Sequence, residues 1–482
     1  MSNNAIISVS DKNNIENITK SLLDAHFNIY STGGTYSRLV DFFPDFIERI
    51  IKISDYTGFP EILGGRVKTL NPKIYGGILP DLNNPEHLEQ IKQHDINIFS
   101  VVIVNLYPFE QENSIENIDI GGVSLIRASS KNYENVSILT NPSQYAEYID
   151  QYYINKGNID VEVKRKWAAE GFLHTTNYDK HIYNFMNNTQ DIQLKYGMNP
   201  HQTPAFVNSN NSFSLINGTL GYINVLDFLH GWLMAYEICK TTNKITFTSM
   251  KHTSPAGLGI GTTISNETMD IFGLEDSLRD SLTECSIAFI KSRNCDPLSS
   301  FGDFICCSST VDEQTARLIK REVCDGIAAV DYTSEALEIL KSKKNGKFII
   351  IKMDSDYFSR MIKEGWTETK SIYGVTLTQP CNNFMFNPKE YGLSDNDFDA
   401  IISYVILKYS QSNNVSMVHD GQLLGLGCGQ QNRVGCVMLA GEKALNWMLR
   451  HHNDVIQFYK SLSSVFKRQE KVNLSKMLRI NL

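Results

Sequence analysis

AIISVSDKNNIENITKSLLDAHFNIYSTGGT (residues 5–35) alternates two kinds of apolar pattern. Residues 5–10 form a short apolar run, which predicts a buried strand. Residues 14–27 predict a helix, because apolar side chains recur there at helical spacing. These side chains are Ile15, Ile18, Leu22, Leu23 and Phe27. Residues 27–35 return to a strand pattern that ends at two glycines, and this order is typical of a β-α-β unit.

The same alternation continues to about residue 150. IFSVVIVNLYPF (98–109) is almost wholly apolar, as expected of a strand that is covered on both faces. GGVSLIRASSKN (121–132) is compatible with a helix, and VSILTNPSQY (136–145) predicts a strand, a turn and the start of a helix. We therefore predict a doubly wound α/β domain over residues 1–150.

The rest of the chain is expected to hold a helical connection and a second α/β region. Residues 151–192 are charged and place apolar side chains at mixed three- and four-residue intervals, which predicts helix. From QLKYGMNPHQTPAF (193–206) onward, the sequence becomes richer in Gly, Asn, Pro and aromatic residues. We expect the second region to span residues 193–482.

The composition limits the classes of function. With 482 residues, the chain is long enough for about two to four structural units. Its hydrophobic content of 42% and charged content of 20% are typical of soluble globular proteins. The net charge of −8 argues against a surface that coats nucleic acids or binds membranes. Neither a signal peptide nor a membrane-spanning run is evident, so we expect a cytosolic protein without nucleic-acid or membrane partners.

The cysteines and histidines do not indicate a metal site. The nine cysteines are an odd number and form no CxxC pair, which is typical of reduced cytosolic thiols. Among the 11 histidines, only His451 and His452 adjoin each other. No spacing of cysteines and histidines matches a structural zinc site, and we expect no bound metal.

Two short polar motifs follow the first two predicted strands. SVSDK (8–12) and STGGT (31–35) would both lie at the carboxyl ends of parallel strands, where open α/β sheets bind ligands. Gly33 and Gly34 would allow backbone N–H groups to approach a phosphate closely. The alternative interpretation of the paired glycines is a plain tight turn.

Charged residues further along the first domain suggest a second part of the same site. The loop GGRVKTLNPK contains Arg66 and Lys68, which could hold a phosphorylated ligand or simply be solvated. IDIGGVSLIRASSKN (118–132) contains Asp119 and Lys131. An Asp and a Lys in one pocket could transfer protons in a ring closure or a dehydration, whereas separately each would be ordinary surface charge.

Lys251 and His252 are adjacent in SMKHTSPAGLGIG (249–261), between a strand-like run and a Pro/Gly-rich stretch that predicts a turn. A neutral imidazole can accept a proton from a weak nucleophile near pH 7, and a neighbouring ammonium can stabilise developing negative charge. The pair therefore indicates a reaction centre. On its own, such a pair is more often ordinary surface.

Five strings of the first domain, taken in order, resemble a known family. They are SVSDK, STGGT, TGFPEILGGRVKTL, NLYPF and IDIGGVSLIRASSKN. They resemble the methylglyoxal-synthase-like cyclohydrolase domain of the bifunctional enzymes of purine biosynthesis. That family formylates 5-aminoimidazole-4-carboxamide ribonucleotide (AICAR) and closes the formylated product (FAICAR) to inosine monophosphate (IMP).

This resemblance implies a nucleotide site and a set of catalytic residues in the first domain. The implied nucleotide-binding residues are Ser10, Asp11, Lys12, Thr32, Gly33, Gly34, Thr35, Arg66, Val67, Lys68, Thr69, Asn105, Asp119 and Ile120. Lys131 is the implied proton donor and acceptor, and Lys68, Tyr107 and Asp119 are expected to assist it.

The second region resembles the transformylase domain of the same family, and most closely its eukaryotic version. The strings that carry this resemblance are LKYGMNPHQTPAF, KHTSPAGLGIG, SSFGDF, REVCDGIAA, KYSQSNNV and GLGCGQQNRVGCVMLAGEKA. They imply a domain with a cytidine-deaminase-like fold. The implied activity of this domain is the transfer of a formyl group from 10-formyltetrahydrofolate to AICAR. His252 is the implied base, Lys251 the charge stabiliser and Asn413 the amide that orients the reacting groups. The implied nucleotide contacts are Lys195, Tyr196, Gly302, Asp325 and Arg433.

The chain departs from the family pattern in three places. Asn71 and Tyr75 stand where the family has histidines, in LNPKIYGGIL. Lys195 stands where the family has Arg, which keeps the charge but loses bidentate geometry, so weaker nucleotide affinity is expected. The family's C-terminal portion, with its PFRDN-type string and Pro-Ser-Gly-Ser loop, is missing. This fits a truncated gene product, an inactive transformylase, or a divergent enzyme that a partner chain completes.

The resemblance also implies small nucleotide and folate substrates, and a homodimer with transformylase sites at the subunit interface. The alternative hypothesis is a nucleotide-binding or regulatory protein that retains the folds but only cyclohydrolase activity, or no activity.

Overall fold

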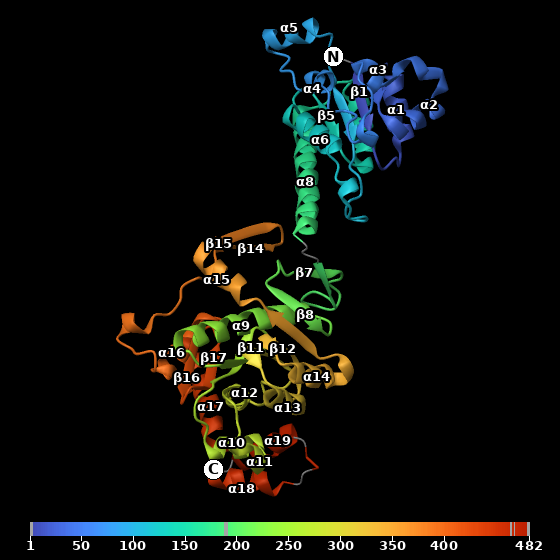
Figure 1. The fold of residues 1–482 in the computed structure, drawn as a ribbon. Helices are drawn as coiled ribbons and strands as arrows, with labels where there is room; N and C mark the ends of the chain where they lie inside the picture. The colour runs from blue at the N-terminus through green and yellow to red at the C-terminus, as the bar shows by residue number, and fades with distance from the viewer. Residues whose placement is uncertain (1–2, 188–190, 463–464, 467, 480–482) are drawn as a thin grey trace. The chain divides into compact units, whose positions relative to one another are not determined.

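The computed structural model describes residues 3–187, 191–462, 465–466 and 468–479. The chain divides into two compact units, Met1–Asn188 and Thr189–Leu482, which we call unit 1 and unit 2. Both units combine helices with a central sheet, so the predicted α/β class is confirmed (Figure 1).

Unit 1 contains a five-stranded parallel sheet in the order β3-β2-β1-β4-β5. Its strands are β1 (Asn4–Ser8), β2 (Asn28–Ser31), β3 (Ile50–Lys52), β4 (Val101–Val104) and β5 (Ser137–Leu139). Its α-helices are α1 (Ile15–Asp24), α2 (Gly33–Phe42), α3 (Ile53–Thr57), α4 (Pro72–Ile78), α5 (Pro85–Gln93), α6 (Gly121–Lys131), α7 (Tyr145–Ile154) and α8 (Val161–Met186). The strand order reverses direction between β1 and β4, and open α/β sheets bind ligands at such a switch point.

The apolar patterns of the sequence form the core of unit 1. The helical stripe of α1 is buried against the sheet, and all four residues of β4 are buried. Helix α8 packs along α6 and β5. Gly171 permits this contact, because a Cβ atom there would lie 2.6 Å from the Ser130 hydroxyl oxygen.

Unit 2 contains an eight-stranded mixed sheet in the order β16-β17-β10-β9-β11-β12-β13-β8. Its strands are β8 (Phe213–Asn217), β9 (Thr246–Lys251), β10 (Ser254–Ile260), β11 (Asp303–Val311), β12 (Cys324–Tyr332), β13 (Ile349–Met353), β16 (Asn414–His419) and β17 (Gln422–Cys428). Two separate ribbons pair β6 (Asp191–Leu194) with β7 (Ala205–Asn208) and β14 (Thr367–Ile372) with β15 (Val375–Pro380). Its α-helices are α9 (Tyr222–Thr242), α10 (Asn266–Phe272), α11 (Asp276–Arg279), α12 (Glu284–Arg293), α13 (Glu313–Arg321), α14 (Ser334–Lys341), α15 (Ser355–Glu364), α16 (Phe398–Lys408), α17 (Arg433–Arg450), α18 (Asn453–Ser461) and α19 (Arg468–Arg479).

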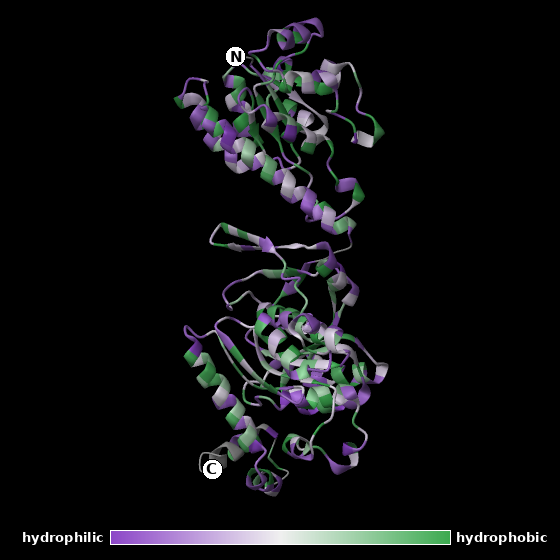
Figure 2. Ribbon diagram, turned by 90° about the vertical axis from the view of Figure 1, so that its left-hand side faces the viewer, coloured by the Kyte–Doolittle hydropathy of each residue, from purple (hydrophilic) through white to green (hydrophobic). Residues whose placement is uncertain are grey.

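Helices cover both faces of this sheet. Phe304 and Cys306 of β11 belong to a core cluster with Phe228 and Trp232 of α9. The alternate residues of β11 instead pack in a cluster with α12 on the opposite face. Figure 2 shows the corresponding concentration of hydrophobic residues on the strands and of hydrophilic residues on the outer helix surfaces. The described helices include none that is long and apolar enough to span a membrane.

The stretch SPAGLGI after the Lys-His pair is a buried strand, β10, and the prediction of a Pro/Gly-rich turn there was wrong. Its glycines serve close packing against α12. A Cβ atom on Gly257 would lie 1.9 Å from the Ser292 carbonyl oxygen, and one on Gly259 would lie 2.4 Å from the Lys291 Cβ. Glycine therefore marks a close helix-sheet contact here rather than a chain reversal.

Candidate active sites in the two units

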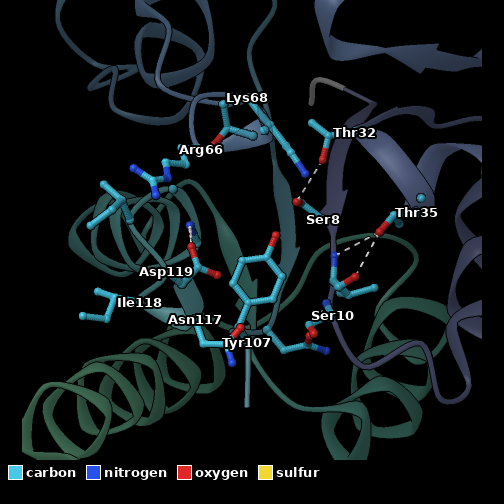
Figure 3. Close-up of a pocket in the computed structure, with 18 of the residues that line it drawn as sticks. Ser8, Ser10, Thr32, Thr35, Arg66, Lys68, Tyr107, Asn117, Ile118 and Asp119 are labelled. Atoms are coloured by element: carbon cyan, nitrogen blue, oxygen red, sulfur yellow. Dashed lines mark hydrogen bonds between the residues drawn. The ribbon is translucent and has the colours of Figure 1, made fainter. Parts of the chain in front are cut away.

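A cavity of about 540 Å³ opens in unit 1 where the strand order reverses. Its walls come from the segments that follow β1, β2 and β4, from the loop before α4 and from the start of α6. In Figure 3, Lys68 points into the cavity from one side, and Tyr107 and Asp119 face it from the other. The cavity thus lies where parallel α/β sheets bind ligands.

Most of the residues predicted for the first site line this cavity. They are Ser10, Lys12, Thr32, Gly34, Thr35, Arg66, Lys68, Thr69, Asn105, Tyr107, Asp119 and Ile120. Asp11, Gly33 and Val67 adjoin lining residues without lining it themselves. The backbone N–H groups of Ser10 and Asp11 donate to the Asn105 side chain, at 2.6 and 2.9 Å, which fixes the loop after β1 against the end of β4.

Lys68 and Asp119 place opposite charges on this cavity. Burial raises the pKa of the Asp119 carboxyl, while the Gly122 N–H that it accepts at 2.7 Å and the nearby Lys68 oppose the rise. Gly65 gives Lys68 its space, because a Cβ atom there would lie 2.7 Å from the Lys68 Cε. A cation, a phenol and a buried carboxyl around one cavity can stabilise a developing oxyanion and move protons.

Two carboxylates of this region were missed in the sequence. Glu61 accepts the Gly33 N–H at 3.1 Å, and Glu116 pairs with the guanidinium of Arg66 on the cavity wall. Both carboxylates therefore occupy donors that we expected to meet a ligand phosphate. Glu61 could have been noticed, since it lies in TGFPEILGGRVKTL beside the expected cations.

Lys131 lies outside this cavity. It is the last residue of α6, whose first residue, Gly121, lines the cavity, and ten residues of helix span about 15 Å. The Lys131 side chain is exposed in a separate open depression that is also lined by Arg127, Arg165 and Phe172. Within one chain, Lys131 is therefore remote from Lys68 and Asp119, and its expected catalytic role stays a prediction.

The two histidine replacements also lie off the cavity wall. Asn71 caps α4 by accepting the Lys73 N–H at 2.9 Å. Tyr75 is partly buried against the core, and burial raises its pKa to about 12. Neither side chain lines the cavity, so the chain keeps the cavity's charged groups despite these departures.

In unit 2, the residues predicted for formyl transfer gather along one edge of the large sheet. Strand β9 ends at this edge, and β10, β11, β12 and β16 begin there. Neighbouring strands lie about 4.8 Å apart, so the edge from β16 to β12 is ~24 Å long. The predicted residues on this edge are Lys251, His252, Gly302, Asp325 and Asn413.

Lys251 is held by the loop that precedes β11. Its ammonium donates to the carbonyl oxygens of Phe301, at 3.1 Å, and Gly302, at 2.7 Å. Gly302 has φ +71°, and a Cβ atom there would lie 3.2 Å from the Lys251 nitrogen. The glycine thus provides both the backbone conformation and the space for this ammonium.

His252 lies in the two-residue turn between β9 and β10. Its neighbour Thr253 donates its backbone N–H to the Asp227 carboxylate at 2.6 Å. Burial raises the pKa of Asp227 to about 6, although the Thr253 N–H and the charges of His252 and Lys251 oppose this. Asp227 was missed in the sequence, where the sole signal is a carboxylate within the apolar run NVLDFLHGWLM.

The structure also places Asn413 and Asp325 of this edge and the three remaining predicted residues of unit 2. Asn413 donates its side-chain amide to the Gln430 carbonyl at 3.3 Å, and Arg433 begins α17 directly after that loop. Asp325 forms an ion pair with Lys344 at 2.8 Å. Lys195 follows β6 and donates its backbone N–H to Leu220 at 2.9 Å, just before α9. Tyr196, next to it, is exposed.

No cluster of metal-ligating side chains occurs in the described part of the chain. All nine cysteines lie within that part and are free thiols.

Comparison with known proteins identifies the family. A family model described as "AICARFT/IMPCHase bienzyme" matches residues 129–443, and one described as "MGS-like domain" matches residues 14–132. The "Bifunctional purine biosynthesis protein PurH" of Prochlorococcus marinus subsp. pastoris (strain CCMP1986 / NIES-2087 / MED4) is 35% identical, over 92% of this chain and 87% of its own length. The chain belongs to the AICARFT/IMPCHase bienzyme family. The protein of the same name from Prochlorococcus marinus (strain MIT 9515) is 34% identical over the same shares of the two chains.

A solved structure titled "Crystal structure of ForH" covers 38% of this chain and 96% of its own, at 29% identity and a TM-score of 0.35.

As a member of this family, the protein is a bifunctional enzyme of purine biosynthesis with AICAR formyltransferase and IMP cyclohydrolase activities. AICAR transformylases use a folate co-substrate. The resemblance found in the sequence is confirmed, and the hypothesis of a regulatory protein is not favoured. The eukaryotic likeness and the shortened C-terminus stay predictions.

Proposed function

We propose that the two reactions are divided between the units, with ring closure in the cavity of unit 1 and formyl transfer along the sheet edge of unit 2. The observation that carries the first assignment is the meeting of Lys68, Tyr107 and Asp119 in one cavity. The second rests on Lys251 and His252, which lie together at the end of β9.

Ring closure requires the carboxamide nitrogen of FAICAR to attack the formyl carbon of the same molecule. A cavity that holds the reactive conformer supplies much of the acceleration. Lys68 would stabilise the oxyanion that forms on the formyl oxygen, and Tyr107 and Asp119 would move protons as the oxygen leaves as water. The hydroxyls and backbone N–H groups after β1 and β2 would bind the ribose phosphate.

Formyl transfer requires the weakly nucleophilic amine of AICAR to attack the formyl carbon of the folate. We propose 10-formyltetrahydrofolate as this donor. His252 would take the amine proton, Lys251 would stabilise the tetrahedral oxyanion, and Asn413 would orient the formyl group. Arg433 would hold a phosphate or carboxylate, and tetrahydrofolate would leave as its N10 takes up the proton from His252.

Replacing Lys68 by alanine is expected to lower kcat for IMP formation from FAICAR by about 10²-fold, because an oxyanion donor is lost. Lys73→Ala is the matched control, since Lys73 pairs with Asp95 instead of lining the cavity. A Lys68 variant that kept full cyclohydrolase activity would remove the assignment of ring closure to this cavity.

Lys131→Ala distinguishes two further arrangements. A site completed within one chain predicts little loss, whereas a loss like that of Lys68→Ala would mean that Lys131 acts from a second chain.

We further propose a cytosolic homodimer, as the family resemblance implies. Support comes from α17, which exposes apolar side chains along one face. They are Val434, Val437, Met438, Leu445 and Met448. This stripe begins next to Arg433, so a partner that covers it would also lie beside the proposed transformylase edge. Sedimentation equilibrium is expected to give about twice the chain mass of 54.6 kDa, and a monomer at micromolar concentration would contradict the proposal.

A further inference from the structure

The turn that carries His252 has an unusual backbone. Lys251 pairs with Ser254 across the β9-β10 hairpin, so His252 and Thr253 alone form the connection. Their φ angles are +51° and +62°. Two-residue turns with two left-handed residues favour Asn-Gly, and a β-branched residue such as threonine is rarely found in this conformation. Within the turn the Thr253 hydroxyl donates to the His252 carbonyl oxygen at 2.7 Å, but these two residue types do not favour the left-handed conformation by themselves.

Asp227 supplies the missing support. Its carboxylate accepts the Thr253 N–H at 2.6 Å, and the residue is 5% exposed on the second turn of α9. The helix is rigidly placed, because the neighbouring Phe228 and Trp232 are fully buried in the core of unit 2. The turn itself is exposed and contributes nothing to that core.

The two members of the Lys-His pair are held by different parts of the fold. Lys251 is fixed by the carbonyl groups of Phe301 and Gly302, before β11. The turn that carries His252 is fixed by α9 through Asp227. The relative position of the ammonium and the imidazole therefore depends on both anchors.

We propose that Asp227 is a positioning residue for formyl transfer, which fixes the Thr253 amide and thereby presents His252 at the correct place beside Lys251. The proposal rests on the assignment of formyl transfer to this turn. Misplacement of a catalytic group by about 1 Å can cost ~10²-fold in rate, so a single anchor of this kind has a measurable effect on turnover.

The test compares five variants of the full chain in both assays. Asp227→Ala is expected to lower kcat for tetrahydrofolate release by about 10-fold or more, with KM for AICAR changed by less than about 3-fold. Asp227→Asn retains an oxygen acceptor for the Thr253 N–H and should stay within about 5-fold of the wild type. Cyclohydrolase activity, which we assign to unit 1, should be unchanged in both. Asp312→Ala is the matched control, because Asp312 accepts the Thr315 N–H at 2.7 Å at the start of α13, away from the turn.

The fourth variant separates turn geometry from general stability. Glycine adopts the left-handed conformation freely, so Thr253→Gly in the Asp227→Ala background should restore kcat by about 10-fold. A merely structural role of Asp227 predicts no such rescue. The double variant places glycine where the backbone is left-handed, so the turn no longer depends on Asp227. It therefore remains informative if Asp227→Ala alone folds poorly.

Three results would overturn the proposal. They are equal losses of kcat in the Asp227→Ala and Asp312→Ala variants, an Asp227→Asn variant as slow as Asp227→Ala, and no rescue by Thr253→Gly. His252→Ala distinguishes these failures from a failure of the assignment itself. Full transformylase activity in that variant would remove the turn from the reaction, and the positioning role with it.

Discussion

Replacing His252 by alanine is expected to lower kcat for formyl transfer by about 10²- to 10⁴-fold, because the amine of AICAR loses its general base. Ring closure of FAICAR should continue at the wild-type rate, since His252 lies in unit 2 and the proposed cyclohydrolase cavity lies in unit 1. The measurement is the release of tetrahydrofolate from AICAR and the formyl donor, beside IMP formation from supplied FAICAR. The variant should accumulate unreacted AICAR.

His419→Ala provides the matched control. His419 is exposed at the opposite end of β16 from the proposed active edge, so its loss tests whether removal of any surface imidazole affects turnover. Both activities are expected to be unchanged in the control. If the His252 variant released tetrahydrofolate at the control's rate, the general base would have to be another group on the same edge. If both activities fell together, the effect would lie in folding rather than in proton transfer.

The fold of unit 1 could be predicted because its strands carry their signal locally. The apolar residues of β4 and the helical stripe of α1 are both buried as their periodicity indicated. The same local rules failed at β10, where Pro255 and two glycines indicated a turn. Those glycines instead permit α12 to approach the sheet, and this depends on a helix about thirty residues further along the chain.

Some residues of the proposed active sites could be predicted from the sequence and others could not. Lys68 and Asp119 were expected at one site because of the family resemblance, and both line the cavity of unit 1. Asp227 could not be predicted, since its partner is the backbone N–H of Thr253 in the turn after β9, 26 residues further along the chain. For Lys131, closeness in sequence did not predict closeness in space. It follows Asp119 closely in sequence, but a full helix carries its side chain away from the cavity.

Replacing Arg293 by methionine is expected to destabilise unit 2 by about 3–5 kcal/mol, because two buried carboxylates lose their shared cation. Arg293 is 3% exposed and pairs with Asp303 at 2.5 Å and Glu322 at 3.1 Å. Methionine keeps much of the side-chain volume, so the loss comes mainly from charge rather than from a cavity. Arg468 lies 2.9 Å from Glu322 and still balances the charge of that carboxylate in the variant. The buried Asp303 carboxylate is therefore the group that loses its cation.

The loss of unfolding free energy in the Arg293→Met variant should depend on pH in a defined direction. Burial raises the pKa of Asp303, and Arg293 opposes the rise. Without the arginine, the pKa in the folded state rises further above its value in the unfolded chain. The folded variant then binds a proton at Asp303 more tightly than the unfolded one, so the stability that this group contributes is present at low pH and is lost as the pH rises through the folded-state pKa. Urea unfolding at pH 5 and pH 8 measures this, with a larger deficit expected at pH 8.

Arg317→Met is the control for loss of an arginine, because Arg317 forms an exposed pair with Glu313 on α13 and should cost less than about 1 kcal/mol at either pH. Equal deficits in the two variants would show that the Arg293 network contributes no more than a surface pair. The network also reaches the proposed active edge, because Asp303 accepts the Ser249 hydroxyl at 2.5 Å, two residues before Lys251 on β9. The carbonyl oxygens that hold Lys251 directly precede Asp303. At low temperature, where the variant stays folded, formyl transfer should therefore still fall relative to the wild type at the same pH, while ring closure is unchanged.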